Sequence, residues 1–182
     1  RYYRKKIPLI IHVNGIRGKS TTTRLIDAGL RNCGYKVFSK TTGTIPTIIN
    51  SNNQDIVIKR LGKANIREQI RMLKKAAKEN VDVLVLECMA VNPELQKICE
   101  EKILNANITI ITNVRMDHIK DMGDTLEELA LALANTTPTN GTLIVNESEF
   151  VKLFTKQANK RNSSLVVAKP YEGIEDLDTF KD

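Results

Sequence analysis

Short apolar runs alternate with longer amphipathic segments along most of the chain. The apolar runs cover residues 7–13, 81–86, 108–112, 142–145 and 165–168. Several of them lack the alternation of polar and apolar residues that is typical of a half-exposed strand, as expected for parallel strands buried on both faces. They therefore predict the strands of a mostly parallel sheet.

Segments with helical periodicity separate these runs, with cap or turn residues at their ends. They cover residues 18–33, 66–79, 93–104, 124–135 and 148–160. Pro93 and Asp124 suit helix starts, because Pro is tolerated in the first turn and an Asp side chain can accept hydrogen bonds from unpaired amides. Strands that alternate with helices predict an α/β fold with a doubly wound, mostly parallel sheet. Residues 35–60 are irregular, which leaves open an additional strand or an active-site loop.

The first predicted strand leads into a candidate phosphate-binding loop, Asn14-Gly15-Ile16-Arg17-Gly18-Lys19-Ser20-Thr21. Backbone amides of such a loop and the N-terminus of the helix that follows it attract phosphate. Lys19 can reach the β- and γ-phosphate oxygens, and the Ser20 hydroxyl can bind Mg²⁺. The spacing departs from the general Gly-x-x-x-x-Gly-Lys-Ser/Thr pattern, since residue 13 is Val. A plain strand-to-helix turn is the alternative.

Two further apolar runs are followed by residues whose side chains can bind metal ions or phosphate. Glu87 comes directly after the second run, and Asn113, Asp117 and His118 follow the third. Ligands of parallel α/β sheets lie outside the carboxyl ends of the strands, so we expect these side chains near the phosphate loop. Glu87 is then a candidate Mg²⁺ ligand, with a solvated loop acid as the alternative, and His118 is a candidate metal or phosphate ligand. His12, inside the first run, is interpreted as a core histidine.

The amino-acid composition indicates the kind of binding partner and the cellular compartment of the protein. Hydrophobic residues make up 41% of the 182 residues and aromatic residues 4%, with no Trp. This indicates a globular domain and argues against an aromatic platform for single-stranded nucleic acid. The formal net charge of +7 indicates anionic partners. Three cysteines without Cys-x-x-Cys spacing argue against a disulfide framework or a zinc site and indicate a reducing, cytoplasmic compartment.

Positive charge is concentrated in two segments. Residues 1–7 are rich in Arg and Lys and lack an initiator Met. We expect residues to precede them, and such a cluster is typical of the cytoplasmic flank of a membrane anchor, with a solvated basic tail as an equal alternative. Residues 59–78 hold eight basic side chains against one acid, Glu68. A solvated helix face is the favoured interpretation, and a surface for an anionic chain or phosphate is the alternative.

The motifs after the three strands resemble those of the Mur ligase superfamily, which includes folylpolyglutamate synthetases. Central ATPase domains of this superfamily carry motifs similar to residues 14–21, 87–90 and 112–118, in this order. Within the superfamily, the chain is most similar to the ligase subunits of poly-γ-glutamate synthetases. The segments that carry this similarity are residues 13–21, 40–44, 87–93 and 122–128.

The resemblance implies an ATP- and Mg²⁺-dependent acid–amino-acid ligase. ATP would phosphorylate a terminal carboxylate, and the amino group of glutamate would attack the acyl phosphate. The implied partners are glutamate, a poly-γ-glutamate chain and membrane subunits of a synthetase complex for capsule synthesis at the cytoplasmic face of the cell membrane. A homo-oligomer is compatible with this, and nucleic acid is not expected. Another Mur-type peptide or folylpolyglutamate ligase, or a nucleotide-dependent regulatory ATPase, remains open.

The resemblance also implies a division of the chain. Residues 8–168 would form the phosphate-loop ATPase domain, and residues 1–7 would be a basic segment behind a removed membrane anchor. Residues 169–182 would be a linker toward a C-terminal domain that lies outside this chain.

Carried over by position, the catalytic roles fall to Lys19, Glu87 and His118. Lys19 would bind the β- and γ-phosphates, Ser20 and Glu87 would hold Mg²⁺, and His118 would bind a second metal ion. The nucleotide-binding set implied in this way is Asn14, Gly15, Ile16, Arg17, Gly18, Lys19, Ser20, Thr21 and Asn113.

The loop Thr42-Gly43-Thr44 resembles one that faces the acyl substrate in the superfamily, and Asp117 is assigned to the same region. Two departures from the family pattern accompany these assignments. No lysine lies between Lys120 and Lys152, where many Mur ligases place a carbamylated lysine. Lys120 also replaces the second acid of the Asp-His-x-Asp pattern, and Asp121 is the nearest substitute.

Overall fold

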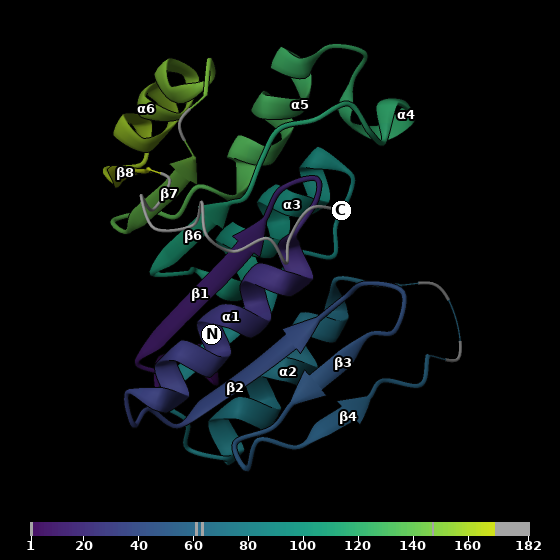
Figure 1. Cartoon of the computed structure of the whole chain (residues 1–182), viewed down its shortest axis with the longest axis vertical. Helices are drawn as coiled ribbons and strands as arrows, with labels where there is room; N and C mark the ends of the chain where they lie inside the picture. Colours follow the sequence, from purple (N-terminus) through teal and green to yellow (C-terminus); the bar gives the residue numbers. More distant parts are fainter. Residues whose placement is uncertain (1, 61, 63, 147, 170–182) are drawn as a thin grey trace, which may run out of the picture.

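A single twisted sheet with helices on both faces organises the chain (Figure 1). The computed structural model describes residues 2–60, 62, 64–146 and 148–169. Within them, the eight strands follow the order β4-β3-β2-β5-β1-β6-β7-β8. Their bounds are β1 Leu9–Asn14, β2 Val37–Thr41, β3 Thr47–Ile49, β4 Asp55–Val57, β5 Val83–Glu87, β6 Ile108–Ile111, β7 Thr142–Asn146 and β8 Ser164–Ala168.

The helices connect the strands of this sheet. No helix in the described part of the chain is both long and apolar enough to cross a bilayer. The α-helices are α1 Lys19–Asn32, α2 Arg67–Lys78, α3 Pro93–Ile98, α4 Ile119–Met122, α5 Leu126–Leu133 and α6 Val151–Lys160. Short 3₁₀ helices cover η1 Arg4–Lys6 and η3 Ala134–Thr136, and a π-helix, η2 Cys99–Leu104, continues α3.

Each predicted apolar run forms a strand, and the predicted doubly wound, mostly parallel sheet is confirmed. From β2 to β8 along the sheet order, all neighbouring strands are parallel. The irregular residues 35–60 hold three strands. β2 extends the parallel part, and β3 and β4 add two antiparallel strands at the edge. The apolar pattern of the sequence does not reveal these strands, because β2 carries polar residues and β4 is exposed.

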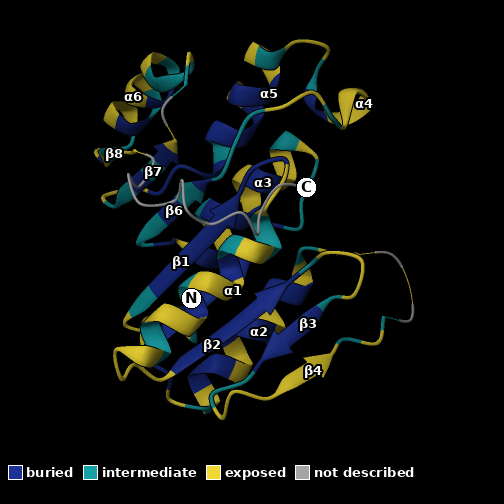
Figure 2. Cartoon of the chain, viewed as in Figure 1, coloured by how far each residue is buried: buried dark blue, intermediate teal, exposed yellow. Residues whose placement is uncertain are grey.

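The central strand β1 is buried on both faces, which explains its continuous apolar sequence. Successive side chains of a strand point to opposite faces. Ile11 and Val13 pack in a cluster with Leu30 of α1, whereas Ile10 belongs to a cluster with Met72 of α2. A third cluster fills the space between β6, β7, α5 and α6. Figure 2 shows the strands at the centre of the sheet buried, while the outer sides of the helices are exposed.

Helix capping follows the predictions at one of two positions. Pro93 begins α3 as predicted, and the Asn92 side chain caps it by accepting from two amides of the first turn at 3.0 and 3.1 Å. The start predicted at Asp124 is wrong by one residue. Thr125 caps α5, because its hydroxyl accepts from the Glu128 amide while the Glu128 carboxylate accepts from the Thr125 amide.

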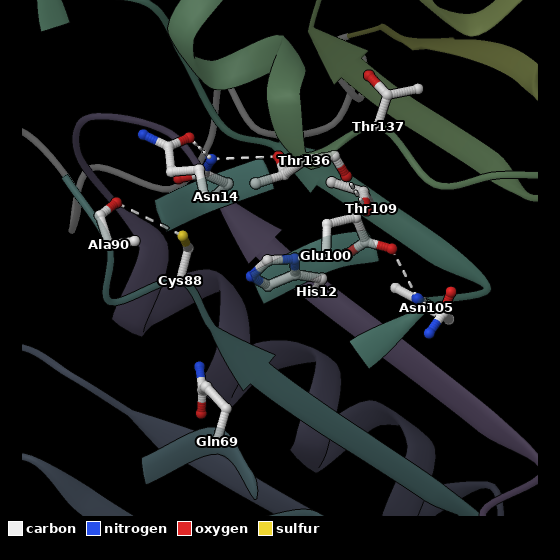
Figure 3. Close-up of polar contacts among 12 residues, drawn as sticks. His12, Asn14, Gln69, Cys88, Ala90, Glu100, Asn105, Thr109, Thr136 and Thr137 are labelled. Atoms are coloured by element: carbon white, nitrogen blue, oxygen red, sulfur yellow. Dashed lines mark hydrogen bonds and ion pairs between the residues drawn. The ribbon is translucent and has the colours of Figure 1, made fainter. Parts of the chain in front are cut away.

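His12 is a core histidine, as predicted, and ties β1 to the π-helix η2. Its Nδ1 lies 3.0 Å from Oε2 of Glu100 in the interior of the domain (Figure 3). The other Glu100 oxygen accepts from the Ala106 amide at 2.7 Å. Burial lowers the pKa of His12, but the neighbouring Cys88 thiol and Glu100 carboxylate outweigh it and raise the pKa to about 10.

A second buried ion pair joins β2 to α2. Lys40 is fully buried, and its Nζ lies 2.7 Å from Oε1 of Glu68. Arg60 donates to both Glu68 oxygens, at 2.9 and 3.0 Å. Burial raises the pKa of Glu68, but hydrogen bonds from Arg60 and Lys40 dominate and lower it to about 2. Glu68 is therefore a carboxylate that holds two cations at the edge of the sheet.

Replacing Glu68 by Gln preserves the shape of the side chain but leaves the buried Lys40 ammonium without a counter-charge. We expect the free energy of unfolding at pH 7 to fall by about 3–5 kcal/mol. The lowered pKa means that Glu68 stabilises the fold fully above its unfolded-state pKa, and that this stabilisation is lost as the pH falls toward about 2. Urea unfolding at pH 7 and pH 3 should therefore show a smaller difference from the wild type at pH 3.

Asp55→Asn is the matched control, because it removes an ion pair with Arg24 in which the two side chains are 45% and 54% exposed. We expect this substitution to change the free energy of unfolding by less than ~0.5 kcal/mol. Equal losses in the two variants would contradict the role assigned to the buried Glu68 carboxylate.

Candidate active site

The carboxyl ends of three neighbouring parallel strands meet at one edge of the sheet. β5, β1 and β6 are adjacent in the strand order, so residues far apart in the sequence come together there. A cavity of about 330 Å³ opens at this edge. Its lining includes Asn14, Gly15, Lys19, Thr42, Glu87 and His118. Predicted site residues from each of the three strand ends therefore line one cavity, whereas Ser20, Asn113 and Asp117 are not among its lining residues.

The loop between β1 and α1 turns at two glycines. Gly15 and Gly18 both have positive φ, at 126° and 79°. Gly15 also passes so close to the end of β6 that a Cβ atom there would collide with the Thr112 hydroxyl and lie 2.9 Å from the Thr112 backbone nitrogen. Gly18 is the left-handed cap from which α1 begins. Both glycines are needed for the loop to turn into the helix at this place.

Residues that follow β6 hold the loop in shape. The Asn113 side chain accepts from the Arg17 amide at 3.1 Å and donates to the Arg17 carbonyl at 3.0 Å. The Thr112 hydroxyl donates to the same carbonyl at 2.6 Å. Asn113, predicted in the nucleotide-binding set, thus lies behind the loop and supports its backbone.

Asn14 and Ile16 also support the loop from within the domain. The Asn14 side-chain amide donates to Gln96 at 2.9 Å and to Thr136 at 3.1 Å, the latter visible in Figure 3. Ile16 is buried in the cluster that includes α5. Of the remaining predicted residues, Thr21 is exposed on α1.

Glu87 joins the phosphate loop to the segment after β2. Glu87 is only 3% exposed. One of its carboxylate oxygens accepts hydrogen bonds from the Ser20 hydroxyl and from the Thr42 amide, both at 2.7 Å. The next residue, Gly43, lies close to Ser20, since a Cβ atom at Gly43 would be 3.2 Å from the Ser20 hydroxyl. Thr42 and Gly43 line the cavity, whereas Thr44 is exposed beside it.

Lys19 is folded back over the loop. Its Nζ donates to the carbonyls of Gly15 at 2.7 Å and Ile16 at 3.0 Å. Burial lowers the pKa of Lys19, and the nearby Glu87 carboxylate opposes this effect. The ammonium group is thus held by carbonyl groups at the mouth of the loop, where an anion offers it stronger partners.

Asp117 and His118 lie on the far side of the loop. Arg17 donates to Asp117 at 2.8 Å, and the other Asp117 oxygen accepts from the His118 amide at 2.7 Å. The hydrogen bond from the His118 backbone lowers the pKa of Asp117. His118 adopts a left-handed conformation at the start of α4, with φ of 52°, and its side chain lines the cavity.

The Glu87 carboxylate, which lines the cavity, and the Ser20 hydroxyl that donates to it form a pair of oxygen ligands that suits a hard cation. Mg²⁺ is usually held by one or two carboxylates together with substrate phosphates and water, so one hydroxyl beside one carboxylate fits it. In residues 2–60, 62, 64–146 and 148–169, no group of three or more His, Cys, Asp or Glu side chains could hold a metal ion by itself. The donor set therefore fits a cation that is shared with a phosphate ligand.

The cavity lining also includes residues outside the predicted site set, among them Arg60, Gln96 and Cys88. Arg60 belongs to the basic run for which a solvated face is the favoured interpretation, yet it reaches the cavity. Gln96 is buried on α3, and Cys88 is buried directly after Glu87. A polar Gln on the inner face of a predicted helix is the one signal that could have indicated Gln96 as a site residue.

A family model of the Mur ligase middle domain matches residues 13–179. The chain belongs to the Mur ligase middle-domain family. The resemblance derived from the three motifs is thereby confirmed, and the matched region contains the phosphate loop, Glu87 and His118.

Relatives in this family include two proteins from Bacillus. PGA synthase CapB of Bacillus subtilis (strain 168) is 42% identical over 164 residues, which are 89% of this chain and 42% of that protein. Capsule biosynthesis protein CapB of Bacillus anthracis is 42% identical over 89% of this chain and 35% of its own length. The Mur ligase middle domain described here thus spans less than half of these relatives.

Solved structures with the same fold include E. coli FolC in complex with DHPP and ADP. It has a TM-score of 0.62 and 18% identity, and the match covers 90% of this chain and 43% of that chain. A bifunctional folylpolyglutamate synthase/dihydrofolate synthase with Mn, AMPPNP and L-glutamate bound has a TM-score of 0.63 and 17% identity over 91% of this chain and 44% of that chain. At this identity the likeness establishes the shared fold.

The close approach of Gly15 to β6 is testable by substitution. Gly15→Ala should lower the free energy of unfolding by about 2–3 kcal/mol, because the new methyl group collides with Thr112 and the φ of 126° is strained for Ala. Gly29→Ala is the control, since nothing lies within 4 Å of its Cβ position in α1. It should raise stability by about 0.5–1 kcal/mol through helix propensity. Thermal and urea unfolding measure both, and similar values for the two variants would contradict the loop geometry.

Proposed function

We propose that this Mur ligase middle domain is the ATP-binding part of an amide ligase that elongates poly-γ-glutamate. The observation that carries the proposal is the buried Glu87 carboxylate, which contacts the Ser20 hydroxyl of the phosphate loop and the Thr42 amide at 2.7 Å. The two CapB relatives, one named PGA synthase and the other a capsule biosynthesis protein, support the choice of polymer.

The reaction proceeds in two transfers. An oxygen of the terminal carboxylate attacks the γ-phosphorus of ATP, and ADP leaves with the electrons of the broken P–O bond. The amino nitrogen of glutamate then attacks the acyl carbon, inorganic phosphate leaves, and the nitrogen loses a proton as the amide forms. The first transfer concentrates negative charge at the transferred phosphoryl group, and the second leaves it on the departing phosphate. The loop amides and Lys19 are placed to stabilise this charge in both. Lys19 would exchange the carbonyls of Gly15 and Ile16 for phosphate oxygens.

Ser20 and Glu87 would hold Mg²⁺, which neutralises phosphate charge when it is bound. Glu87 would then release its hydrogen bond from Ser20, while the Thr42 amide keeps the carboxylate oriented. His118 is proposed as a ligand of a second metal ion, because its side chain lines the same cavity.

The acyl substrate would lie against the segment Thr42-Gly43-Thr44. Thr42 and Gly43 support this placement because they line the cavity beside Glu87. The proposed role of Asp117 is to orient Arg17, to which it is paired at 2.8 Å. This pair would shape the rim of the phosphate loop near the substrate.

The proposed setting is the cytoplasmic face of the cell membrane, together with membrane subunits of a synthetase and with this chain in single or multiple copies. Arg4 attaches the basic segment 1–7 to the fold, since its guanidinium donates hydrogen bonds to the Asn105 carbonyl and the Asn107 side chain. Lys5 and Lys6, the other basic residues in the described part of this segment, are exposed. Apart from Lys169, the proposed linker 169–182 lies outside the described residues.

Coupled turnover tests the proposed function directly. ADP release by the protein that contains this chain should depend on glutamate together with an oligo-γ-glutamate. The Lys19→Ala variant should lose about 10²–10³-fold of this activity, because a charge-assisted contact to the transferred phosphoryl group is removed. Lys36→Ala, at an exposed lysine just before β2, is the control and should behave as the wild type. Hydrolysis that is unaffected by glutamate and oligo-γ-glutamate would identify a regulatory ATPase and reject the ligase.

Magnesium dependence tests the proposed metal ligands. Glu87→Gln should raise the Mg²⁺ concentration for half-maximal activity by about tenfold or more, because the carboxylate charge is lost. His118→Ala should raise it to a smaller extent, as expected for a ligand of the second ion. A Mg²⁺ titration of each variant measures this. An unchanged titration for Glu87→Gln would reject Glu87 as a Mg²⁺ ligand. An unchanged titration for His118→Ala would reject His118 as a metal ligand and leave it a structural role.

A further inference from the structure

A second cavity adjoins the candidate active site. It has a volume of about 620 Å³ and lies between the segment of β3 and β4 and the helix α2. Arg60 lines both cavities, so the two lie next to each other at this residue. We call the second cavity the basic groove, after its cationic lining residues Lys59, Arg60, Arg67, Arg71 and Lys75.

The positive charge of the basic groove is largely uncompensated. Among the described residues that line it, Glu68 is the only acid, and it is already held by Lys40 and Arg60. No carboxylate in the described ranges lies within ion-pair distance of Lys59 or of the three cations on α2. The groove therefore presents a local positive field that attracts an anionic ligand.

The cations on α2 form a stripe along one side of the helix. Arg67, Arg71 and Lys75 are spaced four residues apart, so they lie above one another and face the groove. Like charges at this spacing destabilise a helix, and an anion bound along the stripe removes that penalty. Lys74 and Lys78 of the same helix lie outside the groove lining.

Apolar residues make up another part of the groove lining, which we call the isoleucine wall. Ile48 of β3, Ile56 and Val57 of β4, and Ile58 line it. Ile56 and Val57 are 44% and 55% exposed, which is unusual for large apolar residues on an edge strand. This lining suits a ligand that carries repeated negative charges along an apolar backbone. None of the described lining residues is aromatic, so none of them could stack against nucleic acid bases.

We propose that the basic groove binds the γ-glutamyl chain that the neighbouring site elongates, a placement that rests on the proposed function. Each γ-linked residue carries one α-carboxylate and two methylene groups. The carboxylates would pair with the cations of α2, and the methylene groups would lie on the isoleucine wall. Arg60, held by both oxygens of Glu68, is pre-positioned at the junction to guide the chain terminus into the first cavity.

Binding of fluorescein-labelled γ-glutamate oligomers to the full chain tests this placement, with fluorescence anisotropy as the readout and without ATP. A ten-residue oligomer should bind at least tenfold more tightly than a two-residue oligomer, because it reaches the whole stripe. The double variant Arg71→Gln/Lys75→Gln should weaken binding of the ten-residue oligomer by roughly 5- to 20-fold at low ionic strength. Circular dichroism checks that this variant remains folded.

The matched control is Lys74→Gln/Lys78→Gln, which removes the same charge from the same helix outside the groove. It should bind the long oligomer within about twofold of the wild type. Equal weakening by both double variants would show a general charge effect and overturn the groove. Tighter binding of inorganic polyphosphate or RNA of equal charge than of the γ-glutamate oligomer would overturn the assignment of the ligand.

The proposed role of the groove and the proposed ligase activity can be rejected independently of each other. Glutamate-dependent ADP release with normal elongation of a long oligomer by Arg71→Gln/Lys75→Gln would reject the groove and leave the ligase in place. Groove-dependent binding of the oligomer without any glutamate-dependent turnover would reject the proposed function and leave the binding site in place.

Discussion

The buried carboxylate of Glu87 is the interaction on which the arrangement of the site depends. A carboxylate that is 3% exposed is stable only when its oxygens have hydrogen-bond donors, and here the Ser20 hydroxyl and the Thr42 amide supply them at 2.7 Å. One donor belongs to α1 and the other to the segment after β2. Glu87, the last residue of β5, therefore links the phosphate loop to the proposed substrate loop.

Strand order makes this convergence possible. Because β2, β5, β1 and β6 are neighbours and parallel, the segments that follow them all leave the sheet at one edge. The loop after β1 is supported from β6 by Thr112 and Asn113 and faces Glu87 on its other side. The sheet also continues into β3 and β4, which together with α2 enclose the basic groove. Site and groove thus share one scaffold, and Arg60 connects them.

The parts of the fold that could be predicted are those with continuous apolar strands and short motifs after them. Burial on both faces produces that pattern in β1 and β5, and the motifs then place Ser20, Glu87 and His118 near one another. β2 could not be recognised, because its buried Lys40 looks like a surface residue unless its partner Glu68 is known. The basic run could not be assigned either. Whether its cations face solvent or a cavity depends on β3 and β4, whose residues carry little signal.

The most direct test of the account is a crystal structure of the chain with Mn²⁺ and a non-hydrolysable ATP analogue, with the metal located by its anomalous signal. The account predicts a Mn²⁺ ion bound to the Ser20 hydroxyl and the Glu87 carboxylate, with the phosphates against the amides of residues 15–20 and the Lys19 ammonium. A metal ion away from both Ser20 and Glu87, or a nucleotide whose phosphates lie outside the loop, would contradict it.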